Sequence, residues 1–178
     1  GNVAKILRLA SILAVFCAIS AGGLAFVFML TQPMIELNAK TAFTRSLREV
    51  LPDAISFSEV KSGADRVFRG RGEKNVAGVA VAVSSQGYSG PIELLVGIGA
   101  NNKVKGVKVL GQRETPGLGA NIIKPSFLVQ FVGKDLNNPL EPKKDIDAIT
   151  GATISSRAVC KGVKNSLEAN DRLQRKNK

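Results

Sequence analysis

The segment from Asp147 to Thr153 combines a carboxylate, two hydroxyls and a small Gly151-Ala152 pair directly before a predicted helix. A helix N-terminus offers free backbone N–H groups and the positive end of the helix dipole, which together suit a phosphate. A hydroxyl held there could form an ester with a phosphate. Asp147 could orient that hydroxyl or recruit a metal ion while the phosphate is being attached. The alternative is structural, in which Thr153 or Ser155 caps the helix and Gly151 makes the turn.

A second candidate is the segment "RETPGLGANI", from Arg113 to Ile122. It is consistent with a strand that ends in a proline turn, with glycines at positive φ. Glycines also let a backbone approach a flat ring closely and present N–H groups to it. The residues alone leave both interpretations open.

The composition excludes several kinds of site. The chain has 178 residues, a net charge of +11 and no histidine. Without histidine there is no Ser-His or Cys-His nucleophile pair, no His-ligated zinc and no haem attachment motif. Cys17 and Cys160 are far apart and do not indicate a disulfide or metal framework. A redox centre would therefore need an added cofactor.

Two other binding classes are disfavoured. In "GIGANN", Asn102 stands where the third glycine of a dinucleotide-binding loop belongs, and a predicted hairpin surrounds it. The lysines and arginines are spread along the chain and interleaved with few aromatic residues. We therefore expect the positive charge to lie near anionic lipid or partner subunits and not on nucleic acid.

A long apolar run, Leu9 to Leu30, contains no charged residue. As a helix it would cover about 33 Å, enough for a bilayer core of about 30 Å. It exceeds the apolar core of a signal peptide, which is about 7–15 residues long. We expect a retained transmembrane helix. Lys5 and Arg8 favour a cytoplasmic N-terminus, which would place the following domain outside.

The elements that must position both motifs follow this run. The apolar spacing predicts a helix that stops near Pro52, then several antiparallel strands, with a hairpin turning at Asn101-Asn102, and a closing helix over 154–170. Between the hairpin and that helix we expect a short helix and an extended piece. The fold class is α+β, with flanking helices on an antiparallel sheet. The predicted parts are a cytoplasmic N-terminus (1–8), a transmembrane helix (9–30), a connecting helix (31–52), one compact domain (53–170) and a basic tail (171–178).

Both motifs resemble the FMN-binding domain family. "DAITGAT" is similar to its flavinylation motif, Asp-x-x-[Ser/Thr]-Gly-Ala-Thr, and "GYSGPIELLVGI" followed by "KVKGVKVLGQRETPGLG" is similar to its other signature block. The resemblance implies that FMN is joined through its phosphate to Thr153 by a flavin transferase that uses FAD. It implies no metal and no catalytic residue. The implied flavin-site residues are Asp147, Thr150, Gly151 and Ala152 near the attachment point, and Glu114, Thr115, Pro116, Gly117, Leu118 and Gly119 along the isoalloxazine ring.

Two departures from the family pattern stand out. Thr150 replaces the serine that is expected more often, and Gly111-Gln112-Arg113 stands where many relatives are expected to have a histidine. The second departure leaves the tuning of the flavin open. From position alone, Arg113, Lys124 and Arg157 are candidates to stabilise the phosphate and the reduced flavin.

One anchor helix plus one such domain resembles the family of Rnf-complex G subunits. This implies an electron-carrier subunit of a membrane redox pump between ferredoxin and NAD, with iron–sulfur subunits and a flavin-bearing membrane subunit as partners. The resemblance also implies that the chain is an enzyme only as part of that complex, with no substrate turnover of its own. The alternatives are the C subunit of a Na⁺-pumping NADH:quinone reductase, for which a longer chain is expected, a stand-alone anchored flavoprotein, and an anchored scaffold module without cofactor.

Overall fold

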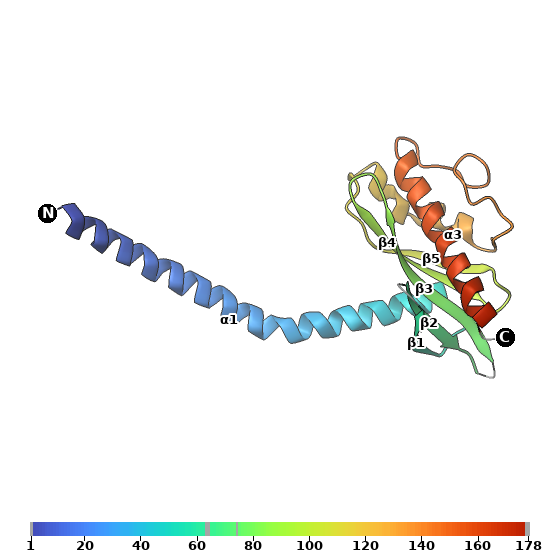
Figure 1. Ribbon diagram of the computed structural model, residues 1–178, viewed down its shortest axis with the longest axis horizontal. Helices are drawn as coiled ribbons and strands as arrows, with labels where there is room; N and C mark the ends of the chain where they lie inside the picture. Colours follow the sequence, from blue (N-terminus) through green and yellow to red (C-terminus); the bar gives the residue numbers. More distant parts are fainter. Residues whose placement is uncertain (1, 63–64, 74, 177–178) are drawn as a thin grey trace. The chain divides into compact units, whose positions relative to one another are not determined.

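A computed structural model describes residues 2–62, 65–73 and 75–176. The chain divides into two compact units, residues 1–43 and residues 44–178. The helix α1 (Asn2–Val50) makes up the first unit and ends in the second. Figure 1 shows the elements along the chain.

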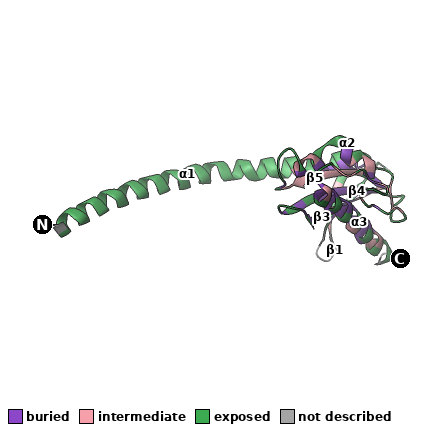
Figure 2. Cartoon of the chain, turned by 90° about the horizontal axis from the view of Figure 1, so that it is seen from above, coloured by how far each residue is buried: buried purple, intermediate pink, exposed green. Residues whose placement is uncertain are grey.

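The first unit is helical and its apolar side chains are exposed, as Figure 2 shows in green. Leu24 is 74% exposed and Phe26 is 64% exposed, which in water would be costly for side chains of this size. Among the described residues, α1 alone is long and apolar enough to cross a membrane. The segments predicted as a transmembrane helix and a connecting helix form one helix, because Pro33 lies inside α1 without ending it.

The second unit is built on a five-stranded antiparallel sheet in the order β1-β2-β3-β4-β5. The predicted hairpin between β4 and β5 is confirmed, and its turn residue Asn102 has a φ of 60°, a conformation that asparagine tolerates better than most residues. A meander of this kind brings the end of β5 close to the start of β4. The strands are β1 (Ser56–Ser62), β2 (Asp65–Arg71), β3 (Val76–Gln86), β4 (Pro91–Gly99) and β5 (Val104–Gly111).

The closing helix α3 (Thr153–Lys176) packs against β3 and β4 (Figure 1). Its predicted apolar face is confirmed, because Val159, Val163 and Leu167 are almost fully buried in the main core. Gly162 lies on this face, where a Cβ would clash with Leu94. The stretch predicted as a basic tail is helical as far as Lys176, since Leu173 continues the apolar stripe and packs against the same core.

The other face of the sheet carries the end of α1. Gly97 and Gly106 are cross-strand partners, and a Cβ on either would press on the backbone of Val50. Ion pairs flank this contact, with Glu49 bound to Lys108 and Asp53 Oδ2 lying 3.3 Å from Lys105 Nζ. The sheet is therefore covered on both faces, and the last turns of α1 belong to the folded domain.

Three short helical segments connect β5 to α3. They are η1 (Gly119–Ile123), α2 (Pro125–Leu128) and η2 (Val129–Phe131). More of this stretch is helical than predicted, and the extended conformation is limited to residues such as Lys124 and Val132 at the ends of the short helices. The buried Phe127 and Phe131 lie one helical turn apart and pack edge to face, with their ring centres 5.6 Å apart. In a strand, Val129 would share the face of these two rings, but it is 61% exposed.

Candidate functional site

A cavity of about 580 Å³ lies between the N-terminus of α3 and the loop that follows β5. Its volume falls in the range of about 300–1,000 Å³ that is usual for small-molecule sites. The two sequence motifs, far apart in the chain, therefore form walls of one site. The lining residues are Tyr88, Glu114, Thr115, Leu118, Gly119, Gly151, Ala152, Thr153, Ile154 and Ser155.

Thr153 is the first residue of α3 and is half-buried in the wall of this cavity. Among the described residues, no hydrogen bond engages its hydroxyl. The neighbouring hydroxyls are engaged: Ser156 Oγ accepts the Ile149 N–H at 3.1 Å and donates to the Ala152 carbonyl at 2.9 Å. Ser156, and not Thr153, therefore makes the side-chain hydrogen bonds that join the start of this helix to the preceding turn. Within the described part of the chain, the Thr153 hydroxyl is left without a hydrogen bond at the first turn, where a helix has N–H groups that it cannot satisfy internally.

The turn into α3 depends on Gly151. Its φ of 77° lies in the left-handed region, and a Cβ there would stand 3.1 Å from Leu118 Cδ2. The Ala152 N–H donates to the Ile149 carbonyl at 2.9 Å, which closes the turn. Thr150, within the same motif, is exposed and does not line the cavity.

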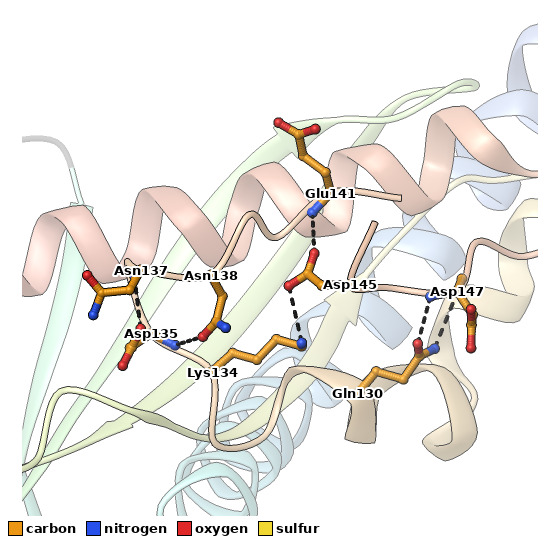
Figure 3. Close-up of polar contacts among 8 residues, drawn as sticks. All are labelled: Gln130, Lys134, Asp135, Asn137, Asn138, Glu141, Asp145 and Asp147. Carbon is orange, nitrogen blue, oxygen red and sulfur yellow. Dashed lines mark hydrogen bonds and ion pairs between the residues drawn. The ribbon is translucent and has the colours of Figure 1, made fainter. Parts of the chain in front are cut away.

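Asp147 is exposed and also lies outside the cavity lining. Its backbone is held from both sides by Gln130, as Figure 3 shows: the Asp147 N–H donates to Gln130 Oε1 at 2.7 Å, and Gln130 Nε2 donates to the Asp147 carbonyl at 3.4 Å. Among the described residues, no hydrogen bond or ion pair engages the Asp147 carboxylate. Sequence reasoning missed Gln130, because no motif marks a glutamine that binds a backbone 17 residues away.

Glu114 supplies a buried carboxyl group, 5% exposed, in the cavity wall. Its Oε1 accepts the Ser89 N–H at 3.0 Å, and its Oε2 accepts the Ser155 hydroxyl at 2.5 Å. Two glycines make the room: a Cβ on Gly87 would clash with Oε1, and one on Gly119 would lie 2.7 Å from Oε2. Glu114 therefore ties the loop after β5 to the first turn of α3.

Of the other residues predicted along the isoalloxazine ring, some line the cavity and some do not. Thr115 and Leu118 line the cavity, whereas Pro116 and Gly117 are exposed and do not. The sequence reasoning did not select three lining residues, Tyr88, Ile154 and Ser155. Tyr88 is the only tyrosine of the chain and stands in the quoted "GYSGP" block, and Ser155 follows Thr153 by two residues, so both could have been found by position.

Most of the charged side chains considered for the site, and both cysteines, lie outside the cavity lining. Arg113, Lys124 and Arg157 are exposed, and none of them lines the cavity. Cys17 and Cys160 are both free thiols. Burial raises the pKa of Cys160 to about 12, so this thiol stays protonated at neutral pH. The cavity wall is therefore mostly apolar or neutral, apart from Glu114.

Two segments of the chain match known families. Residues 87–168 match the FMN-binding domain, and residues 3–50 match the RnfG N-terminal region. All the residues that line the cavity fall inside the first match.

Similar proteins belong to membrane redox complexes. The chain is 38% identical to the G subunit of the proton-translocating ferredoxin:NAD(+) oxidoreductase complex of Clostridium ljungdahlii, over 88% of this chain and 86% of the relative. It is 32% identical to the G subunit of the Na(+)-translocating ferredoxin:NAD(+) oxidoreductase complex of Acetobacterium woodii, over 96% and 94%. Among solved structures, Shewanella oneidensis NqrC has the same fold, with a TM-score of 0.53 at 23% identity over 70% of this chain and 73% of that one.

Proposed function

The chain belongs to the family of G subunits of ion-translocating oxidoreductase complexes, and from this premise we propose that it relays electrons through FMN bound covalently to Thr153. The observation that carries the proposal is the convergence of both motifs on one cavity that holds the Thr153 hydroxyl. In such a complex the chain works as one part of an oxidoreductase.

The cavity suits FMN in size and in the chemistry of its walls. Leu118, Ile154 and Tyr88 offer apolar surface for a flat ring, and the start of α3 offers N–H groups for a phosphate. Gly151, whose Cβ would meet Leu118, leaves the attachment end open. Glu114 would lie along the ring with Thr115 and Gly119.

The attachment reaction would use the Thr153 hydroxyl as nucleophile toward FAD, with a flavin transferase as catalyst. Thr153 Oγ1 bonds to the phosphorus of the FMN half of FAD, the bridging P–O bond breaks, AMP leaves with the electron pair of that bond, and the hydroxyl proton passes to the medium. No oxidation or reduction occurs. The mass gained by the chain is that of FMN less one water.

When bound, FMN would accept and donate one or two electrons. The chain's residues would keep it in place and leave it reachable: Tyr88 is 70% exposed and Leu118 is 48% exposed at the cavity. A covalent link holds the cofactor at an effective concentration of about millimolar or more without tight contacts. This matters for a domain that meets little free flavin.

The proposed setting is a membrane complex. The apolar helix α1 would anchor the chain with its N-terminus in the cytoplasm, and the second unit would lie on the outer side. The partners would be iron–sulfur subunits and a flavin-bearing membrane subunit. Among the alternatives, the match of residues 3–50 to the RnfG N-terminal region favours a G subunit over the C subunit of a Na⁺-pumping NADH:quinone reductase.

The decisive experiment compares Thr153→Val, which keeps the side-chain shape, with Thr153→Ser, which keeps the hydroxyl. Each is produced with the flavin transferase and examined by in-gel flavin fluorescence and intact mass. We expect the wild type and Thr153→Ser to fluoresce and to carry the added mass, and Thr153→Val to be dark and unmodified. A dark, unmodified wild type would overturn the covalent attachment and favour the scaffold module.

A further inference from the structure

Residues 145–153, which end at Thr153, are called the attachment segment below. A pair of hydrogen bonds fixes the backbone near the start of this segment. Gln130 accepts the Asp147 N–H at 2.7 Å and donates to the Asp147 carbonyl at 3.4 Å (Figure 3). One side chain thus satisfies both backbone groups of one residue, as a neighbouring β-strand would. The first of the two bonds is short and is the stronger constraint.

The backbone that carries Gln130 is anchored in the core. Its neighbour Phe131 is 0% exposed, and Phe127, one turn earlier, is 4% exposed in the same core. The two rings pack edge to face. Gln130 therefore extends from a turn whose position the core determines.

Four residues after Gln130, and beyond the end of η2, Lys134 binds Asp145, two residues before Asp147 (Figure 3). Its Nζ lies 3.1 Å from Asp145 Oδ2, and Asp145 Oδ1 accepts the Glu141 N–H at 2.9 Å. Burial raises the pKa of Asp145, but the hydrogen bonds from Glu141 and Lys134 outweigh it and keep the pKa below its ordinary value. Ile146, between the two held residues, is 1% exposed.

The far end of the segment is fastened too, because the Ile149 N–H donates to Ser156 Oγ inside α3. What remains free is the exposed carboxylate of Asp147, six residues before Thr153. We infer that Gln130 is a positioning residue for flavin attachment, which presents Asp147 and the following turn to the transferase in a preformed shape. This inference rests on the proposed attachment to Thr153.

The test is the rate at which the full chain, purified in detergent without flavin, takes up flavin from FAD with Mg²⁺ and a purified flavin transferase. Gln130→Met removes both bonds and keeps the side-chain length, whereas Gln130→Glu keeps an acceptor for the Asp147 N–H. We expect kcat/KM for the acceptor chain to fall about tenfold in Gln130→Met, chiefly through loss of the stronger bond to the Asp147 N–H, and to stay within about threefold in Gln130→Glu, which keeps that bond.

The loss should appear as a higher KM with an unchanged kcat, because a segment that is correctly shaped only part of the time binds the transferase in proportion to that fraction. The matched control is Asn138→Leu. Asn138 Oδ1 also accepts a backbone N–H, from Asp135 at 2.9 Å, and so makes the same kind of bond outside residues 145–153. This variant should be modified at the rate of the wild type.

Three results would overturn the inference while leaving the proposed function intact: a Gln130→Met chain modified as fast as the wild type, equal losses in Gln130→Met and Asn138→Leu, or a loss in kcat alone. A wild-type chain that takes up no flavin, or a Thr153→Val chain that does, would overturn the proposed function and the inference together. Circular dichroism of each variant checks that its fold is retained.

Discussion

At the scale of single residues, the bond between Glu114 and Ser155 joins the two motifs. A buried carboxyl oxygen needs a partner, and here the partner is a hydroxyl on the first turn of α3. Gly87 and Gly119 leave the space that the carboxyl group occupies. The geometry of the cavity thus depends on glycines that leave space for the carboxyl group as much as on the carboxyl group itself.

Ser155→Ala should lower the free energy of unfolding by about 1–3 kcal/mol, because Glu114 Oε2 loses its partner inside the fold. Ser166→Ala is the matched control: Ser166 is also buried on α3, but its hydroxyl donates to a carbonyl of the same helix, so a smaller loss is expected. Urea denaturation followed by circular dichroism measures both. Equal losses of unfolding free energy would show that the hydrogen bond to Glu114 stabilises the fold no more than the bond that Ser166 makes within its own helix.

Cys160 should resist alkylation in the folded protein. The thiolate is the reactive form, and a pKa of about 12 leaves roughly one thiol in ten thousand ionised at pH 8. Peptide mapping after iodoacetamide treatment at pH 8 should find Cys160 unmodified in the native state and modified in urea. Rapid native labelling at pH 8 would contradict the burial of this residue.

At the scale of elements, the contact of α1 with the sheet depends on two glycines that face each other across β4 and β5. Without side chains at Gly97 and Gly106, the backbone of Val50 lies directly on the strands. Leu47 and Leu51 are buried at the same end of the helix, 4% and 0% exposed. The helix end is therefore part of the domain's core.

Gly97→Ala should destabilise the domain by about 3 kcal/mol, because the added methyl group meets the Val50 carbonyl and the backbone must shift. Gly111→Ala, at the end of β5, should cost much less, since its nearest neighbour is the flexible side chain of Glu93, 3.3 Å away. Thermal unfolding of the two variants provides the comparison. A Gly97→Ala protein as stable as Gly111→Ala would mean that the helix end is not tightly packed.

The same elements show what the sequence could reveal. The apolar run, the spacing of Val159, Val163 and Leu167, and the asparagine turn are local signals. The helix over the run, the buried face of α3 and the β4–β5 hairpin that they predict are confirmed, whereas the orientation in a membrane stays a prediction. The contact at Gly97 and the bond from Gln130 to Asp147 join distant segments, and no local pattern encodes them. Near the cavity, the motifs indicated seven of the ten lining residues, and the role of each stays a prediction.

At the scale of the whole molecule, the chain pairs a helix with exposed apolar side chains with a domain whose apolar side chains are mostly inside. The first is suited to lipid and the second to water. Such a division fits a membrane-anchored electron carrier. The proposed orientation, with the domain on the outer side, follows from Lys5 and Arg8 before the apolar run.

Cysteine labelling tests this orientation. In intact cells, a membrane-impermeant maleimide should label Lys124→Cys, which is exposed in the domain, and should label Lys5→Cys only after permeabilisation. The unmodified chain is the background control, because Cys160 is buried and Cys17 lies in the apolar run. The reverse labelling pattern would place the domain in the cytoplasm.

The contacts around the attachment segment also have a consequence for the order of events in the cell. Gln130, Ser156 and Lys134 hold the segment through bonds between protein groups, and the proposal that these bonds preform it implies that its shape does not depend on flavin. With the proposed orientation and attachment, the domain would be synthesised, exported and folded first, and would receive its cofactor afterwards. The pace of maturation would then be governed by the supply of FAD and transferase, and a starved cell would accumulate finished but uncharged protein.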